Sequence, residues 1–139
     1  AKRNALAVLP PECIEAWVAL ERMDISYNRL VVLPDQIGQL AQLRRLMFSN
    51  NKLAAVPTEL GFLTALVELH GAGNTIAELP LSLAECHGMR SLHFGKNAIT
   101  AFPAELCHGL TQLRELHMYQ NKISTIPPDI ACLAGLEAL

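Results

Sequence analysis

Apolar residues recur along the chain with a period of 23 or 24 positions, and an asparagine marks each period. The asparagines that mark the six periods are Asn4, Asn28, Asn51, Asn74, Asn97 and Asn121. Counted from each asparagine, positions −8, −5 and +2 are apolar wherever the chain covers them, and position +6 is always proline. A period of this length along a whole chain indicates a solenoid of stacked units, or coils.

Each coil predicts a short strand just before its asparagine. Positions −5 and −3 share one face of that strand, while position −4 points to the other face. Stacked coils then pair their strands in parallel, about 4.8 Å apart. The asparagine amide turns inward, where it can donate to and accept from backbone groups of neighbouring coils. Proline at +6 cannot extend a sheet, so it directs the chain into short helical turns, for example over 104–113.

These columns resemble the leucine-rich repeat, L-x-x-L-x-L-x-x-N-x-L, along nearly the whole chain. The clearest copy is LRRLMFSNNKLAAVPTELGFL, residues 43–63. The segments LPDQIGQL and VPTELGFL are similar to the LPxx(I/L)xxL pattern of the intracellular Ras-linked and plant Ras-group-related subclass. The resemblance implies an α/β fold: a right-handed leucine-rich repeat solenoid, or α/β horseshoe, with a parallel concave sheet and short helical turns on the convex side.

The repeat occupies residues 1–139 as one domain of about six coils, with the first and last coils truncated. The first asparagine comes too early for a strand to precede it, and Leu139 stands at position −5 of a new coil. Solenoids usually need polar caps over their terminal coils. We therefore expect the chain to be a segment of a longer protein.

Two glycines suggest a phosphate-binding loop at first sight. The stretch Gly71-Ala72-Gly73 lacks the third glycine of a dinucleotide fingerprint, because Ile76 stands in its place. In the repeat, Gly71 occupies the inward position −3, between Phe48 and Phe94 of the adjacent coils. We expect both rings to fill the space above Gly71. Gly73 lies at position −1, on the turn after the strand, where either a left-handed backbone or a shallow surface explains a glycine.

Composition and charge limit the function. A formal net charge of −2 favours neither nucleic acid nor an anionic membrane surface, and no apolar run is long enough to span a bilayer. The four cysteines are scattered singly, which favours a reducing, cytoplasmic environment. No local motif groups a nucleophile, a base and an orienting acid, so we expect no enzyme activity, and no cofactor is predicted.

The open face of the sheet is the predicted binding site, because parallel sheets are normally covered on both faces. Positions −6, −4, −2 and −1 contribute to it. We expect partner contacts from Arg22, Asp24, Arg45, Met47, Glu68, His70, His93, Glu115, His117 and Tyr119. Small residues at Ala72, Gly73 and Gly95 predict a shallow depression among them.

Three histidines of this face, His70, His93 and His117, form one column on consecutive strands. Parallel side chains do not converge on a tetrahedral centre, so we predict no metal site, although adjacent imidazoles favour a mild pH response. Two Cys-His-Gly triplets, starting at Cys86 and Cys107, occupy different places on their coils. Cys86 and Cys13 align with buried leucine or isoleucine positions, and we interpret them as packing residues.

The sequence thus predicts a protein–protein interaction module or scaffold that binds a protein partner on its concave face, in intracellular signal transduction. The subclass resemblance implies a small GTPase or a phosphatase as partner. An alternative is a sensing or regulatory segment of a multidomain enzyme such as a kinase. Flanking sequence of the parent protein would distinguish the two.

Overall fold

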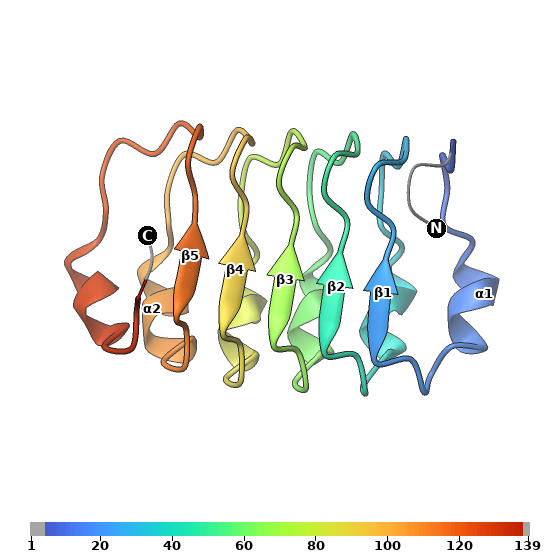
Figure 1. Cartoon of the computed structure of the whole chain (residues 1–139), viewed down its shortest axis with the longest axis horizontal. Coiled ribbons are helices and arrows are strands. Elements are labelled where there is room, and N and C mark those ends of the chain that lie inside the picture. The colour runs from blue at the N-terminus through green and yellow to red at the C-terminus, as the bar shows by residue number, and fades with distance from the viewer. Residues whose placement is uncertain (1–4, 138–139) are drawn as a thin grey trace.

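The computed structural model describes residues 5–137, and it shows a solenoid with one parallel sheet along one side (Figure 1). Five strands lie side by side in chain order, each parallel to its neighbours. The short helical segments lie behind the sheet in this view, so one face is covered and the other is open. We call the open face the concave face and the helical side the convex side.

The strands are three residues long and cover positions −6 to −4 of successive coils. They are β1 (Arg22–Asp24), β2 (Arg45–Met47), β3 (Glu68–His70), β4 (Ser91–His93) and β5 (Glu115–His117). The register pairs equivalent positions, as in Leu69 of β3 with Leu92 of β4. Residues at the same repeat position therefore lie next to one another across the sheet. The predicted parallel α/β solenoid is confirmed.

A proline at +6 precedes every helical segment, in extended conformation, as predicted. The segments are α1 (Pro11–Glu15), η1 (Asp35–Gln39), η2 (Thr58–Phe62), η3 (Leu81–Glu85), α2 (Ala104–Gly109) and η4 (Pro128–Cys132), where η denotes a 3-10 helix. The two α-helices belong to the two 24-residue coils. In α2 the amide of Leu110 reaches back to the carbonyl of Leu106, whereas in η2 the amide of Leu63 bonds Leu60. One extra residue thus converts the tighter turn into an α-helical one.

The asparagines form a ladder of hydrogen bonds between coils. Asn74 donates its amide to the carbonyls of Gly71 at 3.0 Å and Phe48 at 3.2 Å, and its Oδ1 accepts from the Leu53 amide at 3.1 Å. Asn51, Asn97 and Asn121 repeat all three contacts one coil apart. Each asparagine therefore satisfies backbone groups of its own coil and of the preceding one, as the sequence predicts.

The core runs the length of the solenoid between the sheet and the convex segments. Phe48, Phe94 and most of the aligned leucines and isoleucines are fully buried. At Gly71, an added Cβ would overlap the Phe48 ring and would lie 2.9 Å from Cε1 of Phe94. The two rings pack edge to face, with centroids 5.9 Å apart. The prediction that both phenylalanines fill the space above Gly71 is confirmed.

Position −1 adopts a left-handed backbone in all five coils that contribute a strand. The φ angle of Gly73 is 68°, as expected for a glycine in this turn. The equivalent residues Tyr27, Asn50, Lys96 and Gln120 have φ between 51° and 57°, although they carry side chains. Left-handed backbone costs a non-glycine residue roughly 1–2 kcal/mol. The strand hydrogen bonds and the asparagine ladder on either side of this turn offset that cost.

Candidate protein-binding face

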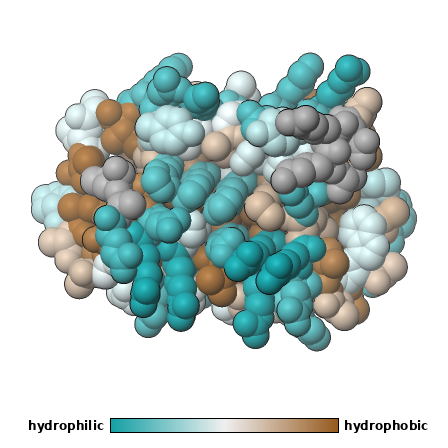
Figure 2. All heavy atoms as spheres, viewed as in Figure 1, coloured by the Kyte–Doolittle hydropathy of each residue, from teal (hydrophilic) through white to brown (hydrophobic). Residues whose placement is uncertain are grey.

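The concave face presents two rows of side chains, one from each outward position of the strands. Position −6 contributes Arg22, Arg45, Glu68, Ser91 and Glu115, and position −4 contributes Asp24, Met47, His70, His93 and His117. Hydrophilic side chains cover much of the middle of this face in Figure 2, and hydrophobic ones gather mainly beyond β5. The structure therefore places the predicted strand residues on one continuous surface.

The β2–β3 part of the face carries an ion pair. A guanidinium nitrogen of Arg45 lies 3.0 Å from a carboxylate oxygen of Glu68, and the two side chains are 41% and 24% exposed. On β1, Arg22 is exposed, and Asp24 accepts a hydrogen bond from the Ser26 amide at 3.1 Å. An ion pair this open to solvent contributes little to stability, which leaves Arg45 available to an incoming carboxylate.

The histidine column is only partly parallel. The rings of His70 and His93 stack with centroids 4.2 Å apart and an angle of 5° between their planes. The ring of His117 also lies 4.2 Å from His93, but it is turned by 77°. The expectation of parallel rings is therefore correct for the first pair and wrong for the second.

Ser91 links His70 and His93 to Glu115, a role that the repeat pattern does not indicate. Its buried hydroxyl donates to Oε2 of Glu115 at 3.2 Å and lies 3.2 Å and 3.0 Å from Nε2 of His70 and His93. Glu115 also reaches Nε2 of His93, at 3.3 Å. The register explains the network, because Ser91 stands beside Glu115 across the β4–β5 pair.

Burial and neighbouring charges lower the pKa values of two of these histidines, His70 and His93. Desolvation, followed by the charge of His93, lowers the pKa of His70, and the carboxylates of Glu68 and Glu115 oppose the shift. Desolvation and then His117 lower the pKa of His93, against the hydrogen bond to Glu115. Burial therefore favours the neutral form of both imidazoles, and the pH response of the column stays a prediction.

The predicted depression at Gly95 is not present. A Cβ on Gly95 would lie 2.5–2.8 Å from three atoms of the Tyr119 ring, and Gly95 is buried. Tyr119 itself is 54% exposed. The ring therefore covers the glycine, and this part of the face is an aromatic platform. The prediction was wrong here because it considered the small residue without its neighbour on the next strand.

Two hollows lie at the first and last coils that the structure describes. One, of about 380 Å³, is lined mainly by core residues of the last coils such as Phe102 and Ile123, with Tyr119 at its edge. Another, of about 320 Å³, includes Trp17 and Leu20. Neither of these two hollows is lined by a residue of β2, β3 or β4.

The two Cys-His-Gly triplets lie on the convex side and meet through one hydrogen bond, which Nδ1 of His87 donates to the carbonyl oxygen of Gly109 at 3.1 Å. Cys86 and Cys107 are fully buried, and desolvation raises the pKa of the Cys86 thiol to about 11. Cys13 was predicted to be buried, and this is wrong because it is exposed. Its coil has one extra residue, so Ile14 stands six positions before Leu20 and fills the buried site. Of the two cysteines that align with buried repeat positions, Cys86 is confirmed as a packing residue and Cys13 is not.

Comparisons with known sequences identify the repeat. The model of the family described as "Leucine rich repeat" matches residues 2–53, and a second model of the same description matches residues 112–133. A 30-residue stretch is 53% identical to the leucine-rich repeat protein SHOC-2 of Danio rerio. That stretch is 22% of this chain and 5% of SHOC-2, so the subclass is supported over one short segment only.

Solved structures match over nearly the whole chain. A leucine-rich repeat protein of Leptospira interrogans is 30% identical with a TM-score of 0.92, over 97% of this chain and 36% of its own. A TDR receptor is 28% identical with a TM-score of 0.87, and the match covers 96% of this chain and 24% of the receptor chain. The plant peptide hormone receptor RGFR1, in complex with RGF2, is 26% identical with a TM-score of 0.75, and the match covers 94% of this chain and 25% of the receptor chain. The chain thus spans about a third of the first of these proteins and about a quarter of the other two.

Proposed function

Since the chain is a leucine-rich repeat solenoid, we propose that its concave face binds a partner protein, as a recognition module of intracellular signalling. One observation carries this proposal. The helical segments cover one face of the sheet, and the other presents charged, imidazole and aromatic side chains on an open surface (Figures 1 and 2). Solenoids generally use such extended surfaces for binding, and leucine-rich repeats generally serve as interaction modules rather than as enzymes.

The comparisons support the class of partner in part. The matched structure of RGFR1 is a complex with RGF2, and a further match, 28% identical with a TM-score of 0.64, is the complex of BIR3 with SERK2. For this chain, the short likeness to SHOC-2 supports a Ras-linked role, with a small GTPase or a phosphatase as the partner that the resemblance suggests. A cytoplasmic location is part of this proposal, and the free state of all four cysteines supports it.

Five side chains define the centre of the proposed contact: Arg45, Met47, His70, His93 and Tyr119. They extend over β2 to β5 and the turn after β5, and Tyr119 is the most exposed aromatic residue among them. Arginine and tyrosine are enriched among the residues that dominate binding energy. None of the helices in the described part of the chain is long and apolar enough to cross a membrane.

Site-directed crosslinking can locate the binding face. A photoreactive amino acid replaces Met47 on the concave face, and in a matched control it replaces the exposed Gln39 on the convex side. We expect the Met47 protein to form a specific crosslinked product in extract of the source cell, and mass spectrometry then identifies the partner. A product that forms only from position 39 would place the interface on the convex side.

Affinity measurements with the identified partner then test individual side chains. We expect Arg45→Ala or Tyr119→Ala to weaken binding by about 2 kcal/mol or more, and Gln39→Lys or Glu59→Lys to leave it unchanged. Because Tyr119 covers Gly95, circular dichroism and thermal melting confirm that each variant is folded. Unchanged affinity in both alanine variants, with loss in the lysine variants, would refute the concave site.

A further inference from the structure

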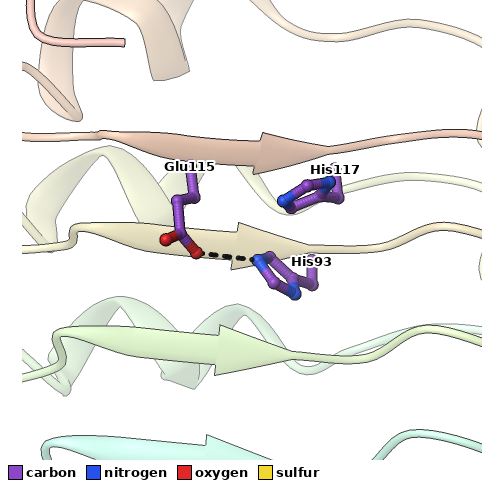
Figure 3. Close-up of side chains that lie close together, drawn as sticks. All are labelled: His93, Glu115 and His117. Carbon is purple, nitrogen blue, oxygen red and sulfur yellow. Dashed lines mark hydrogen bonds and ion pairs between the residues drawn. The ribbon is translucent and has the colours of Figure 1, made fainter. Parts of the chain in front are cut away.

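Three potential metal ligands of the concave face come together across β4 and β5. They are the imidazoles of His93 and His117 and the carboxylate of Glu115, and one ligand atom from each lies within 4.8 Å of the other two. Oε2 of Glu115 is 3.3 Å from Nε2 of His93. Figure 3 shows the carboxylate extending from its strand toward His93, with the His117 ring beside both groups.

We propose that His93, Glu115 and His117 form a binding site for a divalent transition-metal ion of the zinc type. Two imidazoles and one carboxylate are a known zinc-binding combination, in sites that keep a fourth position open. This inference goes beyond the proposed partner binding and does not depend on it, since it requires only this chain and the ion.

The distances are compatible with a small closure around the ion. Zinc binds nitrogen and oxygen at about 2.0–2.2 Å, so neighbouring ligand atoms of a tetrahedral site lie about 3.4 Å apart. The pair formed by His93 and Glu115 already has this separation, at 3.3 Å. The third ligand atom, within 4.8 Å of the other two, needs to approach by up to about 1.4 Å, which rotation of the His117 ring and of the 52% exposed Glu115 side chain can supply.

The surroundings hold the ligands in place. Ser91 is buried and donates its hydroxyl to the Glu115 carboxylate, which orients the carboxylate beside His93. His70 stacks on the opposite side of the His93 ring and limits its rotation.

The site differs from the simple histidine column that the sequence suggests. The rings of His70 and His93 are parallel, and the Nε2 atoms of both contact the Ser91 hydroxyl, at 3.2 Å and 3.0 Å. Convergence arises from His117, whose plane is turned by 77°, and from Glu115 of the neighbouring outward row. The open coordination position faces the solvent on the concave face, where water is the expected fourth ligand of the free protein.

Calorimetric titration of chelator-treated protein with Zn²⁺ alone tests the site. We expect one site with a micromolar or lower Kd, and at least a tenfold loss of affinity in each of His117→Gln and Glu115→Gln. Titration with Co²⁺ gives a second measurement, because tetrahedral Co²⁺ absorbs strongly in the visible range.

A convex cluster provides the matched control. Nε2 of His108 lies 2.8 Å from Asp129, and its Nδ1 lies 3.7 Å from the exposed thiol of Cys132. His108→Gln and Cys132→Ser should leave the Zn²⁺ affinity unchanged. Absence of Zn²⁺ binding by the folded parent protein would overturn the proposal, and so would binding that survives His117→Gln and Glu115→Gln. Partner binding is not part of this assay, so failure of the metal site and failure of the proposed function are distinguishable.

Discussion

Replacement of Gly71 by alanine tests whether the core depends on the space between two phenylalanine rings. The new Cβ would overlap the Phe48 ring and would lie 2.9 Å from Cε1 of Phe94, whereas carbon atoms in favourable contact are about 3.5–4.0 Å apart. Both rings are fully buried and pack against each other, so they have little room to retreat. The backbone of Gly71 lies outside the left-handed region, so the effect comes from packing.

Two opposing contributions set the magnitude. Overpacking a core costs typically about 1–3 kcal/mol. A glycine-to-alanine change at a compatible backbone position stabilises by about 0.4–1 kcal/mol, because it restricts the unfolded chain. We therefore expect Gly71→Ala to lower the free energy of unfolding by about 1–2 kcal/mol. Leucine at the same position should cost more, because its side chain adds three further carbon atoms.

Urea denaturation followed by circular dichroism measures the effect, and Phe48→Leu provides the compensating change. A smaller side chain at position 48 removes the ring that meets the new methyl group. Gly71→Ala should then be neutral or stabilising in the Phe48→Leu background, although it destabilises the parent. Strictly additive effects of the two substitutions, or a rise in stability of the single alanine variant, would refute this account of the core.

Three further predictions follow from other parts of the fold. Asn74→Ala should lower the unfolding free energy by about 3 kcal/mol or more in urea denaturation, because two carbonyls and one amide lose their buried partner; a loss below 1 kcal/mol would contradict this. Cys86, with its pKa raised to about 11, should resist iodoacetamide at pH 8 while the exposed Cys132 reacts, as peptide mass spectrometry would show. Folding lowers the pKa of His70 and His93, so below about pH 6.5 the unfolded state binds more protons than the folded state. The free energy of unfolding of the chelator-treated protein should therefore fall as the pH decreases below about 6.5. A flat profile between pH 7 and 5 would show that their burial has no such effect.

The repeat made the columns of the fold predictable from sequence. The asparagine contacts, the extended prolines and the space above Gly71 each follow from one residue type at one position, because stacking places equivalent positions side by side. Errors arose where a coil departs from the common length. In the first coil the extra residue moves Ile14 into the core and Cys13 to the surface.

The sequence predicted which residues lie on the concave face but not which of their side chains contact one another. The strand positions identify which side chains are presented there, and the structure places them as expected. The turn of the His117 ring, the buried Ser91 hydroxyl and the Tyr119 ring above Gly95 depend on side-chain rotamers chosen between neighbouring strands. A one-dimensional pattern contains no information on those rotamers, so the metal ligand set became visible only in three dimensions.

The direction of the sheet hydrogen bonds determines how the molecule would respond to mechanical force. The strands lie across the long axis of the solenoid, so their hydrogen bonds run along it (Figure 1). A force that pulls the two ends apart acts first on the hydrogen bonds of a terminal coil. These bonds then break one coil at a time, whereas a shearing force would load all five strands together. Each coil released would add about 80 Å of extended chain, at about 3.5 Å per residue. The protein should therefore extend in small, regular steps at low force, which suits an elastic spacer as well as a binding surface.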